Sequence, residues 1–188
     1  FHAVAVRGGQ FFERFATLDV REVVAWCRTL DASAVGIDAP CCWSRIGRAR
    51  LCERALSDTG IHCFATPSQE VAEHHPFYSW MLNGADLFRR ITSHYRLFDG
   101  RHSISSPVCF ETFPHAVDCA LAGTILSATH KRSGRRRLLR EAGLSIDSLS
   151  NIDMVDAALC AHTAHHLLAG TVQTYGDAAE GVIVVPRV

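Results

Sequence analysis

Alternating and periodic hydrophobic positions divide the chain into short strands and amphipathic helices. Residues 2–6 and 11–17 favour β structure on either side of the turn sequence RGGQ at 7–10, and so predict a hairpin. Asp19 then occupies the first position of a capping box, and apolar residues on one helical stripe continue to about Leu30. The pattern therefore predicts two strands followed by a helix.

Two nearly continuous apolar runs predict buried strands, and each closes on an acid followed by a proline. The first covers residues 32–37 and ends in Asp38-Ala39-Pro40. The second covers residues 107–114 and places Glu111 shortly before its final proline. Strands without polar alternation are typical of sheets that are covered on both faces. Their alternation with helices predicts an α/β fold.

The rest of the chain predicts further helices and one last strand. Helical patterns cover residues 47–56, 84–95, 115–121 and 135–142, whereas 61–67 is extended or loop. Ser150 or Asn151 caps an Ala-rich helix that stops at Gly170, and residues 182–185 form a final apolar strand. Because no repeat or wide linker interrupts this order, we expect residues 1–188 to form a single domain.

Composition excludes a membrane-spanning or disulfide-stapled class. The 188 residues include 48% hydrophobic types, yet no apolar run approaches the roughly 18 residues of a membrane span. We therefore expect a cytoplasmic protein with no membrane partner. The eight cysteines lack paired C-x-x-C spacing and mostly lie beside apolar residues, which predicts buried free thiols.

The charge is balanced overall but unevenly distributed. The formal net charge is zero, with 19 basic and 19 acidic residues. One ten-residue segment nevertheless contains six cations and no acid: Lys131, Arg132, Arg135, Arg136, Arg137 and Arg140. Such a segment predicts a local phosphate-binding surface, with a solvated helix face as the equally open alternative.

Four acids occupy positions where a functional site is expected. Asp38 and Glu111 lie at carboxyl ends of predicted strands, where side chains leave the packed sheet. Asp153 and Asp156 are three residues apart and share a face of the last helix. A capping role explains Asp153, but Asp156 lies deeper in an apolar helix and needs a cation or a metal beside it. Converging carboxylates favour Mg²⁺ or Mn²⁺ and phosphoryl hydrolysis.

Other site classes are less well supported. His162, His165 and His166 on the last helix, with His74-His75 elsewhere, allow a zinc site, but no His-Glu-x-x-His arrangement occurs. The chain also lacks the Gly-x-Ser-x-Gly turn of many serine hydrolases and the phosphate-binding loop of nucleotide-driven motors.

Several short motifs together resemble the domain of unknown function 429 family over nearly the whole chain. They are Gly36-Ile37-Asp38-Ala39-Pro40, Arg50-Leu51-Cys52-Glu53-Arg54, the helix at Gly84, Glu111-Thr112-Phe113-Pro114, the segment from Lys131 to Leu139, Asp153-Met154-Val155-Asp156-Ala157 and the strand from Gly181 to Pro186. The resemblance implies a ribonuclease H-like fold and a predicted nuclease. Asp38 matches the acid of the fourth strand, Asp153 and Asp156 match the helix pair, and Glu111 matches a Glu-x-x-Pro element.

One departure from the family pattern concerns the first strand. Ribonuclease H-like sheets begin with a central strand that supplies a metal-binding Asp, and only then continue with the hairpin. Here the hairpin comes first, so either upstream residues are absent from the sequence or the protein has lost a ligand. We favour the first explanation, because a sheet without its middle strand leaves two unpaired edges.

The resemblance and the residues together give a specific functional expectation. Asp38 and Asp156 are expected to bind Mg²⁺ or Mn²⁺, with Asp153 as a supporting or alternate ligand and Glu111 as a ligand or the group that orients the attacking water. The expected nucleic-acid contacts are Arg50, Arg54, Lys131, Arg132, Arg135 and Arg136. Pairing of Arg50 and Arg54 with nearby acids on the surface is the alternative for those two.

Two other functions remain open because one fold serves many activities. The domain could be a catalytically silent binding or scaffolding module that keeps the sheet and the basic segment. It could also be a nucleotide-binding phosphotransferase of the same fold.

Overall fold

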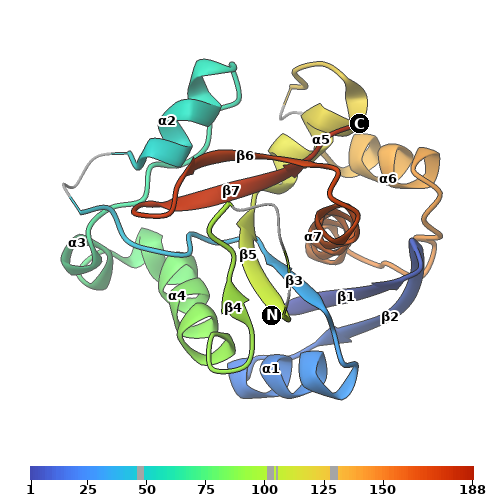
Figure 1. Cartoon of the computed structure of the whole chain (residues 1–188), viewed down its shortest axis with the longest axis horizontal. Coiled ribbons are helices and arrows are strands. Elements are labelled where there is room, and N and C mark those ends of the chain that lie inside the picture. The colour runs from blue at the N-terminus through green and yellow to red at the C-terminus, as the bar shows by residue number, and fades with distance from the viewer. Residues whose placement is uncertain (46–48, 101–103, 105, 128–130) are drawn as a thin grey trace.

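A computed structural model gives the positions of residues 1–45, 49–100, 104, 106–127 and 131–188, and the description covers these residues. Figure 1 shows a mixed sheet with helices on both faces, and a separate hairpin that packs against helix α7 (Ile152–Leu168). The predicted α/β class is confirmed. None of the helices in these ranges is long and apolar enough to cross a bilayer.

The chain begins with the predicted hairpin. Strands β1 (His2–Arg7) and β2 (Gln10–Ala16) pair antiparallel, with a shift of register after Ala5. Gly8 and Gly9 in the turn have φ angles of 56° and 78°, a conformation that glycine adopts without steric cost. Helix α1 (Val20–Thr29) follows, and the Asp19 carboxylate accepts a hydrogen bond from the backbone N–H of Arg21. Hairpin and helix therefore lie where the sequence predicts them.

The main sheet has five strands arranged around β5 (Val108–Thr112). One edge of β5 pairs in parallel with β3 (Ala34–Ile37). The other edge pairs with the short β4 (Arg96–Leu97) and then with β7 (Gly181–Pro186), both parallel to it. Strand β6 (Val172–Asp177) closes the sheet antiparallel to β7. All five residues of β5 are buried, in agreement with the prediction of a covered central strand.

Seven α-helices and one 3₁₀ turn connect the strands in the described ranges. After α1 they are α2 (Leu51–Asp58), α3 (Gln69–Glu73), the 3₁₀ turn η1 (Pro76–Tyr78), α4 (Ser79–Ile91), α5 (Pro114–Ala122), α6 (Lys131–Glu141) and α7 (Ile152–Leu168). The helix expected at 47–56 begins at Leu51, while residues 46–48 lie outside the described ranges. The helix expected at 84–95 begins already at Ser79 and ends at Ile91.

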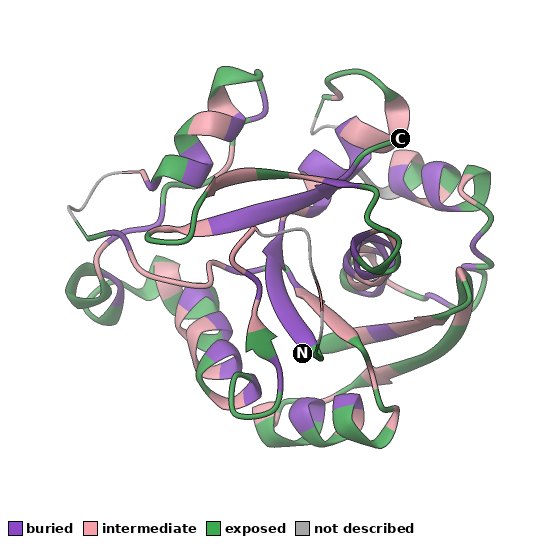
Figure 2. Cartoon of the chain, in the orientation of Figure 1, coloured by how far each residue is buried: buried purple, intermediate pink, exposed green. Residues whose placement is uncertain are grey.

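The two faces of the main sheet have separate apolar cores. On one face Ile37 and Cys109 pack with residues of α1 and α4 such as Val23 and Phe88. On the other face Phe110 of β5 packs with Ala164 and Leu167 of α7. Figure 2 shows buried residues concentrated on β5, β7 and the inner side of α7. Neighbouring residues of β5 thus supply both cores, because side chains alternate across a sheet.

The approach of α7 to β3 is unusually close at one point. A Cβ atom added at Gly36 would lie 2.7 Å from the backbone oxygen of Cys160 and 2.9 Å from the ring of Phe110. Only a residue without a side chain fits between the strand and the helix there. Gly36 therefore allows α7 to pack directly beneath β3.

The hairpin and the main sheet do not join. Strands β1 and β2 form a sheet of their own, and β3 is the edge strand of the five-stranded sheet. Within the described residues no strand lies between β1 and β3, although α7 packs against both. The described residues therefore contain two separate sheets, and α7 packs against both.

Candidate functional site

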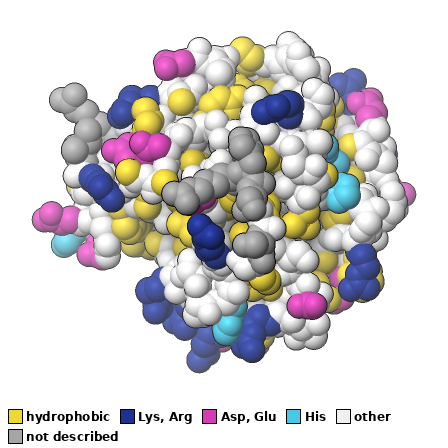
Figure 3. All heavy atoms as spheres, in the orientation of Figure 1, with side chains coloured by type: hydrophobic (Ala, Val, Ile, Leu, Met, Phe, Trp, Pro, Cys, Tyr) yellow, Lys and Arg dark blue, Asp and Glu magenta, His cyan; other side chains and the backbone are white. Residues whose placement is uncertain are grey.

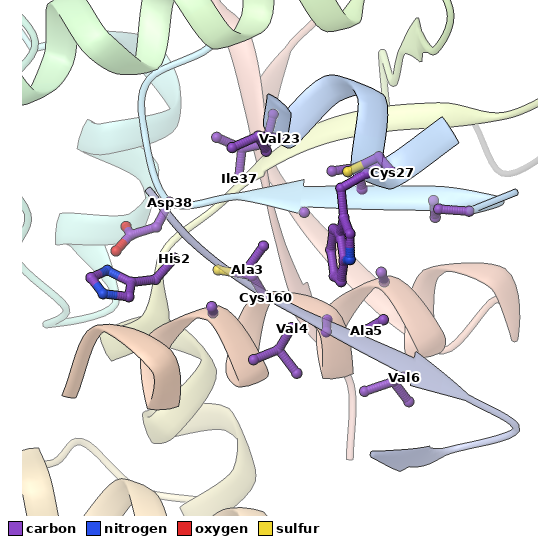
Figure 4. A pocket seen from close by; sticks show the side chains of 18 of the residues that line it. His2, Ala3, Val4, Ala5, Val6, Val23, Cys27, Ile37, Asp38 and Cys160 are labelled. Carbon is purple, nitrogen blue, oxygen red and sulfur yellow. The ribbon is translucent and has the colours of Figure 1, made fainter. Parts of the chain in front are cut away.

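A groove of about 600 Å³ separates β1 from β3, and we call it the β1–β3 groove. Its walls are the two strands, with residues of α7 along one side and residues of α1 along the other. Figure 4 shows the groove with β1 and β3 on either side. His2 at the start of β1 lies beside Asp38 at the end of β3, so the two strands run in opposite directions.

Asp38 lies at one end of this groove. The strand β3 buries Ile37 and then delivers Asp38 to an exposed position ahead of Pro40. The carboxylate points in the direction of His2 (Figure 4), and Asp38 lines the groove. The expectation that the strand end presents its acid at a crevice is consistent with this position.

The start of α7 brings Asp153 and Asp156 to the same end of the groove. The side-chain oxygen of Asn151 accepts a hydrogen bond of 2.8 Å from the N–H of Met154, so Asn151 is the N-cap. Both acids line the groove with Asp38. The Asp153 side chain is 63% exposed, and its Oδ2 lies 3.7 Å from Nδ1 of His2.

The cation that Asp156 needs comes from α6. Arg135 donates to Oδ2 of Asp118 at 2.6 Å through Nε and to Oδ1 of Asp156 through Nη1. Burial alone would lower the pKa of the Arg135 guanidinium, but the two carboxylates outweigh burial and raise its pKa above the ordinary value. Asp156 is therefore held by an ion pair that also joins α5 and α6 to α7.

Glu111 does not line the groove with the other three acids. Its two carboxylate oxygens accept hydrogen bonds of 2.8 and 2.6 Å from Nη1 and Nη2 of Arg50, and Oε2 also accepts one of 2.8 Å from the N–H of Cys41. Nε of Arg50 donates to Glu53 at 2.9 Å. Glu111 thus belongs to a buried ion-pair network that fixes the loop after β3 and the start of α2 to the centre of the sheet.

The expected role of Arg50 is corrected by its burial. Arg50 is 2% exposed, and its guanidinium is bonded to two carboxylates, so it is not available to nucleic acid in this structure. The alternative of pairing with Glu53 is correct, but the pair is buried rather than on the surface. Arg54 is exposed, and its Nη1 donates to the backbone oxygen of Ala49 at 2.5 Å.

Much of the basic segment also serves internal contacts. Arg135 is 4% exposed, which corrects its expected contact with nucleic acid. Arg136 donates to the backbone oxygen of Leu149, and Arg137 and Arg140 pair with nearby acids on the surface. The side chains of Lys131 and Arg132 lie outside the described part of the chain. On the face drawn in Figure 3, basic side chains gather most at the lower edge, where α4 ends and α1 lies.

The four predicted acids do not form a complete metal cage. Among the described residues no group of three or more His, Cys, Asp or Glu side chains is arranged to hold a metal ion. The histidines of α7 therefore form no such metal site with other described residues either. His162 is buried, its Nε2 lies 3.2 Å from Nε2 of His166, and burial followed by the nearby His166 lowers its pKa to about 4. His162 is thus a neutral histidine of the core.

Sequence reasoning missed the position of His2. The side-chain amide of Asn151 lies 3.4 Å from Nε2 of His2 and can only donate there, so the neutral imidazole carries its proton on Nδ1, toward Asp153. A histidine at the start of an edge strand has no sequence signal that links it to a helix about 150 residues later. The thiols follow the prediction of buried free cysteines in part: all eight are free and five are buried, but Cys41, Cys42 and Cys63 are partly exposed.

Comparison with known proteins identifies a family without an assigned activity. No curated protein and no solved structure gives a significant match to the chain. A family model described as a protein of unknown function, DUF429, matches residues 1–180. Because this match covers nearly the whole sequence, the chain belongs to the DUF429 family.

Proposed function

We propose that the protein is a divalent-metal-dependent phosphodiesterase that acts on nucleic acid. The observation that supports this proposal is the convergence of Asp38, Asp153 and Asp156 at one end of the β1–β3 groove. These acids come from a strand end and a helix start that are more than a hundred residues apart in the sequence. Carboxylates gathered at the carboxyl end of a parallel strand are typical of sites in α/β enzymes.

The donors fit Mg²⁺ or Mn²⁺ in kind. Both ions prefer carboxylate oxygens, and Mg²⁺ often uses only one or two carboxylates together with water and substrate phosphates. Asp38 and Asp153 are exposed, and Asp156 lines the groove with a guanidinium beside it. When bound, the ion would polarise a phosphodiester and lower the pKa of a bound water.

The surrounding residues set the charge and the proton positions at this end of the groove. Arg135 neutralises Asp156, which lowers the repulsion among the three carboxylates. Nδ1 of His2 lies 3.7 Å from the Asp153 carboxylate and adds a hydrogen-bond donor beside the acids. Arg54, on the exposed side of α2, remains a proposed phosphate contact, as do Lys131 and Arg132.

A cleavage assay tests this proposal. End-labelled RNA, single-stranded DNA, duplex DNA and an RNA–DNA hybrid are incubated with the protein in Mg²⁺ or Mn²⁺. We expect cleavage of at least one substrate, and no cleavage when a chelator removes the metal. The cleavage rate of Asp38→Asn should fall by more than about 100-fold, because even the partners that support a metal ligand contribute about 10–100-fold to metal affinity or activity. Asp58→Asn, which changes an exposed acid of α2 away from the groove, should cleave normally.

One observation favours a second function, that of a non-catalytic binding module. Two of the four predicted acids, Glu111 and Asp156, are already neutralised by buried guanidinium groups. If the protein is such a module, its affinity for nucleic acid should be the same with and without metal, and none of the four substrates should be cleaved. The cleavage assay therefore separates the two functions.

A further inference from the structure

Two histidines that the proposed function does not use lie one turn apart near the end of α7. Nε2 of His162 is 3.2 Å from Nε2 of His166. In the described part of the chain neither residue lines the β1–β3 groove, so the pair is on a different side of the helix from the groove acids. His162 is 5% exposed and His166 is half-buried, so solvent reaches the pair from the His166 side.

The separation of these two nitrogens matches that of two ligands on one transition-metal ion. Imidazole nitrogens bind Zn²⁺ at about 2.0–2.1 Å, so two of them on one ion lie about 2.9–3.4 Å apart for angles between a right angle and a tetrahedral one. The ring centroids are 4.6 Å apart and the ring planes are inclined by 75°. Rings that met end to end through nitrogens at 3.2 Å would have more widely separated centroids. At least one nitrogen therefore points aside from the other, as both must when they share an ion.

Thr171 sets the tautomer of His166. Nδ1 of His166 lies 2.8 Å from Oγ1 of Thr171, and the same hydroxyl donates its own proton to the backbone oxygen of His166 at 3.3 Å. The hydroxyl must therefore accept from Nδ1–H, which leaves the lone pair of the imidazole on Nε2. Histidines that bind metal almost always donate their other ring N–H in this way.

The tautomer of His162 has no such constraint among the described residues. Its Nδ1 is buried and has no hydrogen-bond partner in those ranges. In the metal-free protein its Nε2–H is the donor toward Nε2 of His166. Moving the ring proton to Nδ1 breaks no hydrogen bond at that atom and frees the lone pair on Nε2. Both imidazoles can then offer a lone pair to one ion, which would replace their direct contact.

We propose that Nε2 of His162 and Nε2 of His166 bind one Zn²⁺ ion or a similar imidazole-preferring ion. Imidazole suits Zn²⁺, Cu²⁺ and Ni²⁺, whereas Mg²⁺ and Mn²⁺ prefer carboxylate oxygens. Two protein ligands are fewer than a closed zinc site has, so water completes the coordination and the ion is exchangeable. It holds the last turns of α7 together, where the chain turns into β6 (Figure 1).

This site is separate from the proposed carboxylate site. His166 follows Asp153 by thirteen residues along α7, which is about 20 Å at 1.5 Å per residue. The binding of Zn²⁺ to the two histidines therefore does not depend on the proposed nuclease activity.

A Zn²⁺ titration followed by ¹⁵N NMR of the imidazole nitrogens tests the site. Excess Mg²⁺ is present throughout, so that the groove carboxylates do not compete for Zn²⁺. We expect Nε2 of His162 and Nε2 of His166 to shift together and to saturate with one equivalent of Zn²⁺, and Mg²⁺ alone to leave both unchanged. Nδ1 of His166 should stay protonated, because it donates to Thr171.

Variants separate this pair from other side chains that bind zinc. His166→Gln removes one ligand and should weaken Zn²⁺ binding by more than about 100-fold, whereas Thr171→Val removes only the partner of Nδ1 and should weaken it by about 10-fold. The control is His165→Gln, because that ring lies at the hairpin turn, where a Cβ atom of Gly9 would be 3.4 Å from its Nε2. His165→Gln should bind Zn²⁺ like the wild type. Competition with a chelator measures the affinities, and circular dichroism checks that each variant is folded.

Three results would overturn the proposal. The first is no shift of the two Nε2 signals up to about 1 mM Zn²⁺, the weak limit of a specific contact. The second is a Zn²⁺ affinity that His166→Gln leaves unchanged or, should that variant fail to fold, that the exposed change Thr171→Val leaves unchanged. The third is a loss in His165→Gln as large as that in His166→Gln. Cleavage of nucleic acid in Mg²⁺ together with any of these results would leave the proposed activity standing and reject the histidine site.

Discussion

The clearest energetic consequence of the structure concerns Glu111, because its ion pair with Arg50 is buried. Glu111→Ala leaves Glu53 as the carboxylate partner of the Arg50 guanidinium and removes the acceptor of the Cys41 N–H. Removing one partner of a buried ion pair costs about 3–5 kcal/mol, and one lost backbone acceptor adds about 1 kcal/mol. Since Glu53 compensates part of the charge, we expect a loss of about 4 kcal/mol in the free energy of unfolding.

Urea unfolding followed by far-ultraviolet circular dichroism measures this loss. In a domain of this size 1 kcal/mol shifts the melting temperature by about 2–4 °C, so the thermal midpoint should fall by about 8–16 °C. The matched control is Glu141→Ala, which breaks the exposed pair with Arg137 and should change stability by less than about 1 kcal/mol. A loss for Glu111→Ala as small as that of the control would refute the structural role of this pair.

The same variant separates stability from catalysis. If Glu111 acts only through the fold, the folded fraction of Glu111→Ala at low temperature should keep its cleavage rate per folded molecule. A loss of more than about 100-fold in that fraction would instead support a direct role of the carboxylate in the reaction.

Three further changes test packing, titration and reactivity. Gly36→Ala should destabilise the fold by about 1–3 kcal/mol, because its methyl group would meet the backbone of Cys160. The control, Gly134→Ala in helix α6, should be neutral or stabilising. Chemical denaturation measures the free energy of unfolding of both variants. The folded state holds the pKa of His162 at about 4, below the ordinary 6.5, so the free energy of unfolding should fall as the pH drops from about 6.5 toward 4. His162→Phe should reduce this pH dependence, which unfolding curves at pH 7 and 4.5 measure. An equal pH dependence in the wild type and the variant would contradict the role of His162. A hydrogen bond from Cys41 and the nearby Arg50 guanidinium lower the pKa of Cys42 to about 6. Iodoacetamide at pH 7 should therefore label Cys42 before the buried thiols, and mass spectrometry of peptides measures the order of labelling. Labelling of Cys42 only after unfolding would contradict this expectation.

The local elements of the fold could be predicted because their determinants are close in sequence. The glycines at the hairpin turn, the Asp19 cap and the apolar run before Asp38 each specify a structure within a few residues. Strand β6 was missed because its segment, Val172–Asp177, is largely polar and lies mostly outside the buried core. Its pairing with β7 stabilises it, and no local pattern reports that pairing.

The candidate site could be predicted in part. The sequence placed Asp38, Asp153 and Asp156 at element ends, and the need of Asp156 for a cation followed from its depth in an apolar helix. The identity of that cation, Arg135, depends on how α6 packs against α7. The partner of Glu111 lies 61 residues away in Arg50, and a contact of such sequence separation leaves no signal in the residues around either one.

Binding of Mn²⁺ tests the central claim most directly. Electron paramagnetic resonance of a Mn²⁺ titration counts the ions bound to the protein and to two variants, Asp38→Asn and Glu111→Gln. The account predicts that the wild type binds Mn²⁺, that Asp38→Asn loses this binding, and that folded Glu111→Gln keeps it. Equal Mn²⁺ binding by the wild type and Asp38→Asn, or none by the wild type with nucleic acid present, would contradict it.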